Sequence, residues 1–166
     1  MSIRPLRACL AALLASTLLL SAIGPGTAED AKPASAEAGV IALRSRYGVE
    51  ETVARLKADI AAKGITFFQE IDQSALAARS GVELRPSVLL VFGNPPLGAQ
   101  FMTANPQAGL DWPVRMLVYR DDAGTVWVAY TEFAWIARRH GVTSRDAQFR
   151  KAAEVAASIG DSVSGR

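Results

Sequence analysis

Residues 88–119 read VLLVFGNPPLGAQFMTANPQAGLDWPVRMLVY, and this stretch decides the fold. Val88–Phe92 is apolar at every position, which predicts a strand covered on both faces. The prolines after Asn94 end this strand, a short helix is predicted over Leu97–Ala104, and a second apolar strand begins at Val114. A loop held between two rigid strands is a common position for binding groups.

The second strand continues into a hairpin. Val114–Arg120 and Thr125–Thr131 flank the turn sequence Asp-Asp-Ala-Gly, which suits two antiparallel strands. Val40–Leu43 predicts a further short strand. Alternation predicts another over Ile65–Ile71, with one side formed by Ile65, Phe67 and Ile71 and the other by Thr66, Phe68 and Glu70.

Helical periodicity is clearest over Val49–Lys63, where apolar residues recur at steps of four, three and four and Gly64 can end the helix. Shorter helical segments are predicted over Ser74–Arg79 and Phe133–Arg139. An alanine-rich final helix is predicted over Arg145–Ile159, with 160–166 as a frayed tail. This order predicts an α+β domain, an antiparallel sheet with helices packed on one face.

The sheet face opposite the helices is predicted to be apolar. If Met116 and Val118 face the helices, the other face presents Phe68, Leu117, Tyr119 and Trp127. An exposed patch of this kind usually marks an interface, so we expect a homodimer that covers it. The alternative is that helices or loops of the same chain cover it.

The N-terminal residues resemble an export signal. Arg4 and Arg7 precede an apolar or small-residue run over 8–23, and small residues at 26–28 suit a cleavage site. We therefore expect a signal peptide over 1–28, a flexible spacer over 29–39 and a periplasmic or secreted protein without a stable membrane span. An uncleaved anchor is the alternative, although the run is short of the roughly 20 residues that span a bilayer.

Charge and cysteine content exclude several functions. With Arg4 and Arg7 removed, the 18 basic residues become 16, equal to the 16 acidic ones, so nucleic acid is not an expected partner. Cys9 is the only cysteine and leaves with the signal, which excludes thiol chemistry and disulfides in the mature chain. A single histidine, His140, excludes a histidine-based zinc site. We expect no cofactor and no metal, although an all-oxygen calcium or magnesium site stays open.

The candidate ligand-binding residues flank the loop over 93–113. They are Asn94, Met102, Asn105 and Arg115; the guanidinium of Arg115 can pair with a carboxylate. Turn formation explains both asparagines equally well, because each precedes a proline. Met102 also suits a core position, and Arg115 can pair with Asp111 or Glu132.

Candidate acids and bases are few. Glu70 and Asp72 lie two apart on a strand and could form a carboxylate pair, or simply a solvated edge. His140 follows two arginines at a predicted helix end, where a capping role is expected. The nucleophile elbow, phosphate loop and dinucleotide motifs do not occur.

Many short motifs occur in one order along the chain. They are Gly64-Ile65-Thr66, Leu84-Arg85-Pro86, Phe92-Gly93-Asn94-Pro95, Leu97-Gly98, Met102, Asn105-Pro106, Gly109-Leu110-Asp111, Pro113-Val114-Arg115 and Trp127–Tyr130, with the helix Val49–Lys63. In these motifs the chain resembles the domain-of-unknown-function family 302 over residues 40–142. The resemblance implies a fold similar to the TATA-box-binding-protein-like class, β-α-β(4)-α, often as a dimer, with 143–166 outside the domain.

Two departures from the family pattern weaken an enzymatic interpretation. Similar members often have Asp-His where this chain has Asp72-Gln73, and Asn-Asp-Pro where it has Thr131-Glu132-Phe133. The favoured hypothesis is therefore a non-catalytic, exported module that binds a small molecule or an envelope protein. The alternatives are a cofactor-free hydrolase or isomerase that uses Asp72 or Asp111 with Arg115, and a purely structural dimer.

Overall fold

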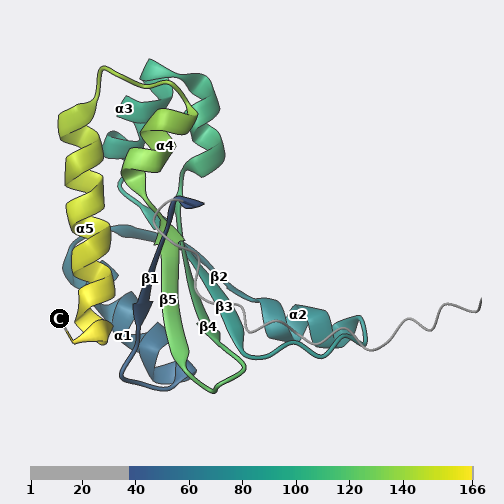
Figure 1. The fold of residues 1–166 in the computed structure, drawn as a ribbon. Coiled ribbons are helices and arrows are strands. Elements are labelled where there is room, and N and C mark those ends of the chain that lie inside the picture. The colour runs from purple at the N-terminus through teal and green to yellow at the C-terminus, as the bar shows by residue number, and fades with distance from the viewer. Residues whose placement is uncertain (1–37, 166) are drawn as a thin grey trace, which may run out of the picture.

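The computed structural model describes residues 38–165, which form a five-stranded antiparallel sheet with helices on one face (Figure 1). The strands lie in the order β1-β5-β4-β3-β2; they are β1 (Val40–Arg44), β2 (Thr66–Asp72), β3 (Ser87–Gly93), β4 (Val114–Arg120) and β5 (Val126–Thr131). The helical elements are α1 (Val49–Ala62), α2 (Gln73–Arg79), α3 (Pro95–Ala104), η2 (Pro106–Asp111), α4 (Phe133–Arg139) and α5 (Asp146–Ser164). The α+β fold prediction is confirmed. The expected signal peptide and nearly all of the spacer lie outside the described residues.

The hydrophobic core lies between the sheet and the helices α1 and α5. Met116, Val118 and Val128 are fully buried beneath these helices. Leu56 and Ile60 of α1 are fully buried opposite them, as the periodicity of that helix predicts. Burial of each such side chain stabilises the fold by roughly 1.5–3 kcal/mol, so this layer holds the sheet together.

The opposite side of the sheet, called the open face below, carries half-buried apolar residues. Leu117, Tyr119 and Trp127 alternate with the buried residues of β4 and β5, as predicted. Leu89 of β3 pairs with Leu117 and lies on the same face. The prediction that β3 is covered on both faces is not met within residues 38–165, because no described helix packs on this side (Figure 1).

The simple alternation predicted for β2 is wrong. A bulge between Phe67 and Gln69 shifts the register of the β2–β3 pair. As a result Phe67 pairs with Phe92 on the helical face, whereas Ile71 pairs with Leu89 on the open face. One extra residue in a strand reverses the side on which all later residues lie.

The C-terminal helix extends beyond its predicted end. Gly160 lies inside α5 and is buried. The neighbouring strand is so close that a Cβ at this position would stand 2.6 Å from Cδ1 of Leu43. The missing side chain lets α5 approach β1, and Val163 beyond it is also buried. The expected frayed tail is thus helical through Ser164, and buried residues of α5 belong to the same core as the sheet.

Segment α2 projects away from the rest of the molecule (Figure 1). It has no buried residue, and Leu76, Val82 and Leu84 in and after it are exposed. Its start is stabilised by Asp72, whose carboxylate accepts from the Ala75 N–H at 2.8 Å. Within residues 38–165, no helix is both long and apolar enough to cross a membrane.

Candidate functional site

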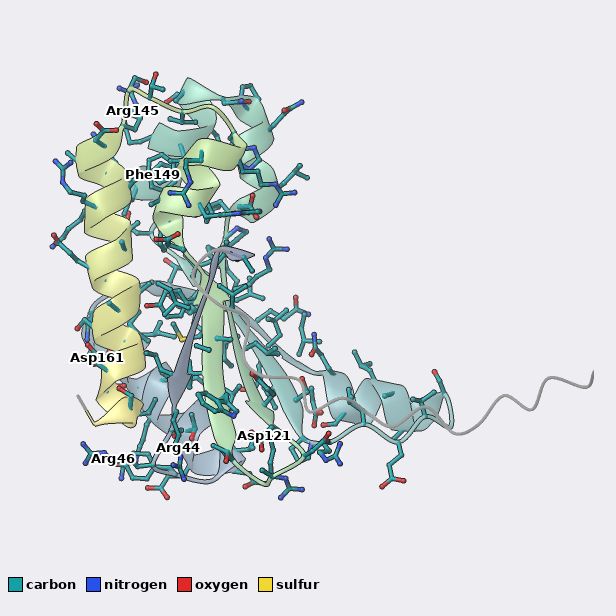
Figure 2. All side chains as sticks on the ribbon, in the orientation of Figure 1. Arg44, Arg46, Asp121, Arg145, Phe149 and Asp161 are labelled. Atoms are coloured by element: carbon teal, nitrogen blue, oxygen red, sulfur yellow. The ribbon has the colours of Figure 1, made fainter. Side chains whose placement is uncertain are left out.

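A cavity of about 580 Å³ opens where β3 runs into α3, between the end of the sheet and α5; we call it the end cavity. Its apolar walls include Ile65, Phe92, Leu97, Phe101, Trp112 and Phe133. Phe149 extends from α5 toward the helices at this end of the molecule (Figure 2), and its ring packs on Phe101 at 4.3 Å between centroids. Ligand pockets in proteins are commonly about 300–1,000 Å³ and mainly apolar, so the end cavity has the size and character of one.

Trp112 forms one wall of the end cavity and is held from two sides. A Cβ at Gly93 would stand 3.2 Å from the indole, and a Cβ at Gly98 would overlap it. Phe68 meets the indole edge-on, with the ring centroids 5.9 Å apart. The two glycines therefore make room for a large flat side chain whose position is set by packing.

Polar residues occupy the mouth of the end cavity, and all of them are exposed, in contrast to the buried phenylalanines. These residues are Lys63, Asn94, Lys151, Glu154 and Ser158. Lys63 pairs with Asp59. The arrangement places charged groups around an apolar interior.

Of the four predicted ligand-binding residues, Asn94 lines the end cavity. Its Oδ1 also accepts from the Leu97 N–H at 3.0 Å and so caps α3, which begins at Pro95 rather than at Leu97. A proline is favoured at the start of a helix, where its missing N–H has no partner to lose. No local sequence pattern marks Trp112 or Phe133 as site residues, because their convergence on the end cavity depends on tertiary packing.

Met102 and Asn105 lie outside the lining of the end cavity. Met102 packs against η2, where its Sδ would stand 3.4 Å from a Cβ at Gly109. Asn105 donates from Nδ2 to the His140 carbonyl at 2.8 Å and accepts from the Gln107 N–H at 2.9 Å. Both residues therefore join α3 and η2 to their neighbours.

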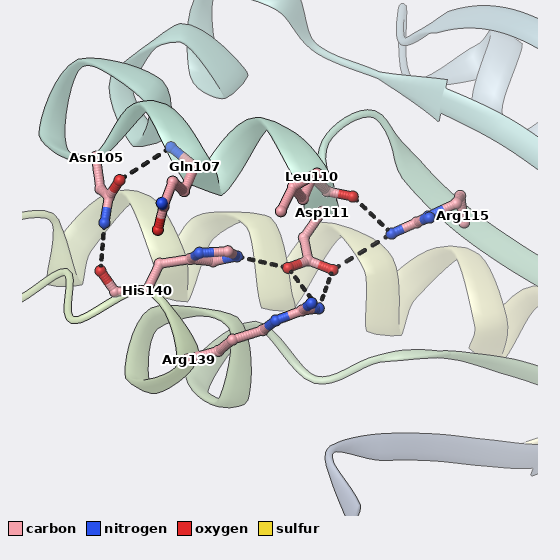
Figure 3. A network of polar contacts seen from close by, with 7 residues as sticks. All are labelled: Asn105, Gln107, Leu110, Asp111, Arg115, Arg139 and His140. Atoms are coloured by element: carbon pink, nitrogen blue, oxygen red, sulfur yellow. Dashed lines mark hydrogen bonds and ion pairs between the residues drawn. The ribbon is translucent and has the colours of Figure 1, made fainter.

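Arg115, the fourth predicted ligand-binding residue, belongs to a polar cluster centred on Asp111 (Figure 3). Both oxygens of the Asp111 carboxylate accept from Arg139 Nη1 at 3.1 Å. The Oδ1 atom also lies 3.3 Å from Arg115 Nη2. His140 Nε2 lies 2.6 Å from its Oδ2. Arg115 also donates to the Leu110 carbonyl at 2.9 Å.

The burial of this cluster is uneven. The Asp111 and His140 side chains are 4% exposed, whereas Arg115 and Arg139 are 48% and 44% exposed. His140 follows α4 as expected of a capping residue, but its ring is buried against a carboxylate from η2. No local sequence pattern pairs Asp111 with His140, because they are 29 positions apart in the chain.

The other candidate carboxylates have structural partners. Glu70 pairs with Lys57 of α1 at 2.7 Å. Hydrogen bonds from the Ser74 hydroxyl and the Ala75 N–H lower the pKa of Asp72, the opposite of the shift expected for a general base in a carboxylate pair. In residues 38–165, no group of three His, Cys, Asp or Glu side chains is arranged to hold a metal ion.

Of the four predicted interface residues, Leu117, Tyr119 and Trp127 lie on the open face, and Phe68 lies at the bulge in β2. Tyr119 and Trp127 are paired neighbours on the open face, where burial raises the pKa of the Tyr119 phenol. The Trp127 indole donates to Asp121 at 2.7 Å, and this bond lowers the pKa of that carboxyl. Phe68 lies beside the position at which Phe92 of β3 pairs with Val114 of β4. Val114 is five residues, about 17 Å along β4, from Tyr119.

Comparisons with known proteins identify a family. Residues 41–162 match the model of a family described as domain of unknown function DUF302, a range that includes most of α5. A solved structure, described as an uncharacterized conserved protein DUF302 from Bacillus stearothermophilus, superposes with a TM-score of 0.69 at 17% identity. It covers 75% of this chain and 98% of that chain, so the likeness shows the fold.

Curated relatives come from Brucella. The fluoride-specific ion channel FluC 1 of Brucella suis biovar 1 is 36% identical over 106 residues, which are 64% of this chain and 42% of the relative. FluC 2 of Brucella melitensis biotype 1 is also 36% identical over 106 residues, which are 39% of its length. The chain thus matches about two fifths of these relatives.

Proposed function

The chain belongs to the DUF302 family, and from its geometry we propose that it is a non-catalytic module that binds a small, mainly apolar molecule in the end cavity. The observation that carries the proposal is the cavity itself, with buried aromatic walls and a mouth of exposed polar groups. Burial of apolar ligand surface against such walls supplies affinity of about 25 cal/mol per Å² before the costs of association. The polar mouth then fixes orientation.

The contacts of the candidate acids support binding rather than catalysis. Both oxygens of Asp111 face cationic or imidazole partners of the chain itself, and Asp111 is not among the residues that line the end cavity. Asp72 caps α2. A hydrolase or isomerase that uses either carboxylate with Arg115 would need a substrate cavity beside these groups.

Binding is tested with N-phenyl-1-naphthylamine, a neutral dye whose fluorescence rises in apolar surroundings. We expect saturable binding by the wild type and at least about a tenfold weaker affinity for Val155→Trp, because the larger ring fills the space that Val155 lines. Ala147→Trp adds the same ring at an exposed position of α5 outside the lining and should bind as the wild type does. Equal binding by both variants would contradict the proposal.

We further propose that the open face binds a second copy of the chain. Its half-buried Leu117, Tyr119 and Trp127 support this, since a second copy would remove them from water. Light scattering at micromolar concentration should show a dimer for the wild type and a monomer for Tyr119→Glu, which introduces a charge into the contact. Ala58→Glu, on the exposed side of α1, should stay dimeric. A monomeric wild type at this concentration would contradict the proposed dimer.

An envelope location is part of the same proposal. The motif of Arg4, Arg7 and the apolar run after them supports export, and N-terminal sequencing of protein recovered from the envelope would test cleavage after Ala28.

The similar regions in proteins named as fluoride-specific ion channels support a role beside a membrane transport protein. Copurification of the domain with such a channel would test that role; a failure of the two to associate would count against it.

A further inference from the structure

The polar groups at the mouth of the end cavity are mostly hydrogen-bond donors. Lys63, Lys151 and Ser158 carry N–H or O–H groups, whereas an ionised Glu154 can only accept. The Nδ2 amide hydrogens of Asn94 can also donate to a ligand, while its Oδ1 accepts from the Leu97 N–H. A ligand group with several acceptor atoms suits this mouth better than a donor does.

Lys151 and Glu154 define the charge of the mouth on the α5 side. They are three positions apart on α5, a spacing at which side chains often pair, yet they form no ion pair with each other or with another group in residues 38–165. Lys63, by contrast, is paired with Asp59. Lys151 is therefore the ammonium left to meet a ligand.

We propose that the end cavity takes an organic anion, a carboxylate or similar acid group attached to an apolar body. This inference rests on the proposed function. The apolar body lies against Phe92, Phe101 and Trp112, and the acid group stays at the mouth near Lys151 and the Asn94 amide. At the exposed mouth the acid group of the ligand keeps some of its bound water, which avoids the cost of burying a charge.

Two dyes with the same ring system separate this inference from the proposed function. 8-Anilino-1-naphthalenesulfonate carries a sulfonate, and N-phenyl-1-naphthylamine is its neutral counterpart. We expect the anionic dye to bind the wild type about threefold more tightly, the size of effect that an exposed charge pair contributes. The difference should shrink in 1 M salt, where charges are screened beyond about 3 Å.

Substitutions at the mouth should act on the anionic dye alone. Lys151→Gln should weaken its binding about threefold and leave the neutral dye unchanged, whereas Glu154→Gln should strengthen it by removing a like charge. Arg150→Gln removes the neighbouring exposed charge, which does not line the end cavity, and should bind both dyes as the wild type does. Decanoate and 1-naphthoate as competitors distinguish an aliphatic from an aromatic body.

Each outcome decides a separate question. If both dyes bind equally in every variant, or if Lys151→Gln and Arg150→Gln behave alike, the anion inference is wrong and the apolar cavity function stands. If the wild type binds neither dye, the proposed function itself fails. Stronger binding of the anionic dye that Lys151→Gln abolishes supports both.

Discussion

Asp111→Ala is expected to destabilise the domain by about 3 kcal/mol, because removing the buried carboxylate leaves the buried His140 ring without its partner. His140 carries most of this cost, since its ring is 4% exposed and its Nε2 has Asp111 as its partner. Arg115 and Arg139 are nearly half exposed and can turn to water. The free energy of unfolding in urea, followed by tryptophan fluorescence, measures the change.

A matched carboxylate elsewhere provides the control for this prediction. Glu83 is exposed, and Glu83→Ala should change the free energy of unfolding by no more than about 0.5 kcal/mol. In a double-mutant cycle, His140→Ala should cost much less when Asp111 is already alanine. A loss below about 1 kcal/mol for Asp111→Ala, or additive costs in the cycle, would show that the cluster does not hold the fold together.

Gly98→Ala is expected to cost about 2 kcal/mol, although alanine in an open helix is favoured over glycine by about 1 kcal/mol. The sign reverses because a Cβ at this position overlaps the Trp112 indole, a rigid ring held by Phe68 on another side. Relief of the overlap would move the wall of the end cavity. We therefore also expect weaker binding of N-phenyl-1-naphthylamine, measured with the same titration as for the wild type.

The Trp112→Phe background tests the cause of this effect. If the overlap with the indole is responsible, Gly98→Ala should cost clearly less stability when the smaller phenyl ring occupies position 112. An equal cost in both backgrounds would point instead to the backbone of α3. In that case the close fit between α3 and Trp112 would not be what sets the cavity wall.

Periodicity explains why most of the fold could be predicted. The steps of Val49, Val53, Leu56 and Ile60 mark a helix face whatever surrounds them, and the alternation in β4 and β5 separates Val118 from Tyr119. The bulge at Phe68 could not be predicted in the same way, because an extra residue leaves the composition of β2 unchanged. A glycine late in a helical segment indicates a helix end, whereas Gly160 lies inside α5, because its close approach to Leu43 depends on tertiary packing.

The candidate site was harder to predict than the fold. Asn94 could be found because an asparagine before prolines after a strand is a local pattern. The carboxylate of Asp111 and the ring of His140 meet across 29 positions, and the cavity walls come from three helices and the sheet. Local patterns carry no information about such contacts.

The sequence by itself determined the type and order of the elements and the family, since these depend on local spacing of apolar residues and on short motifs along the chain. Tertiary structure decided where Trp112 stands, which partners Asp111 has and that a cavity opens beside α5. The physical reason is that cavities and buried charge clusters are properties of packing between segments distant in the chain, where an overlap of one Cβ or a shift of one register position changes the result.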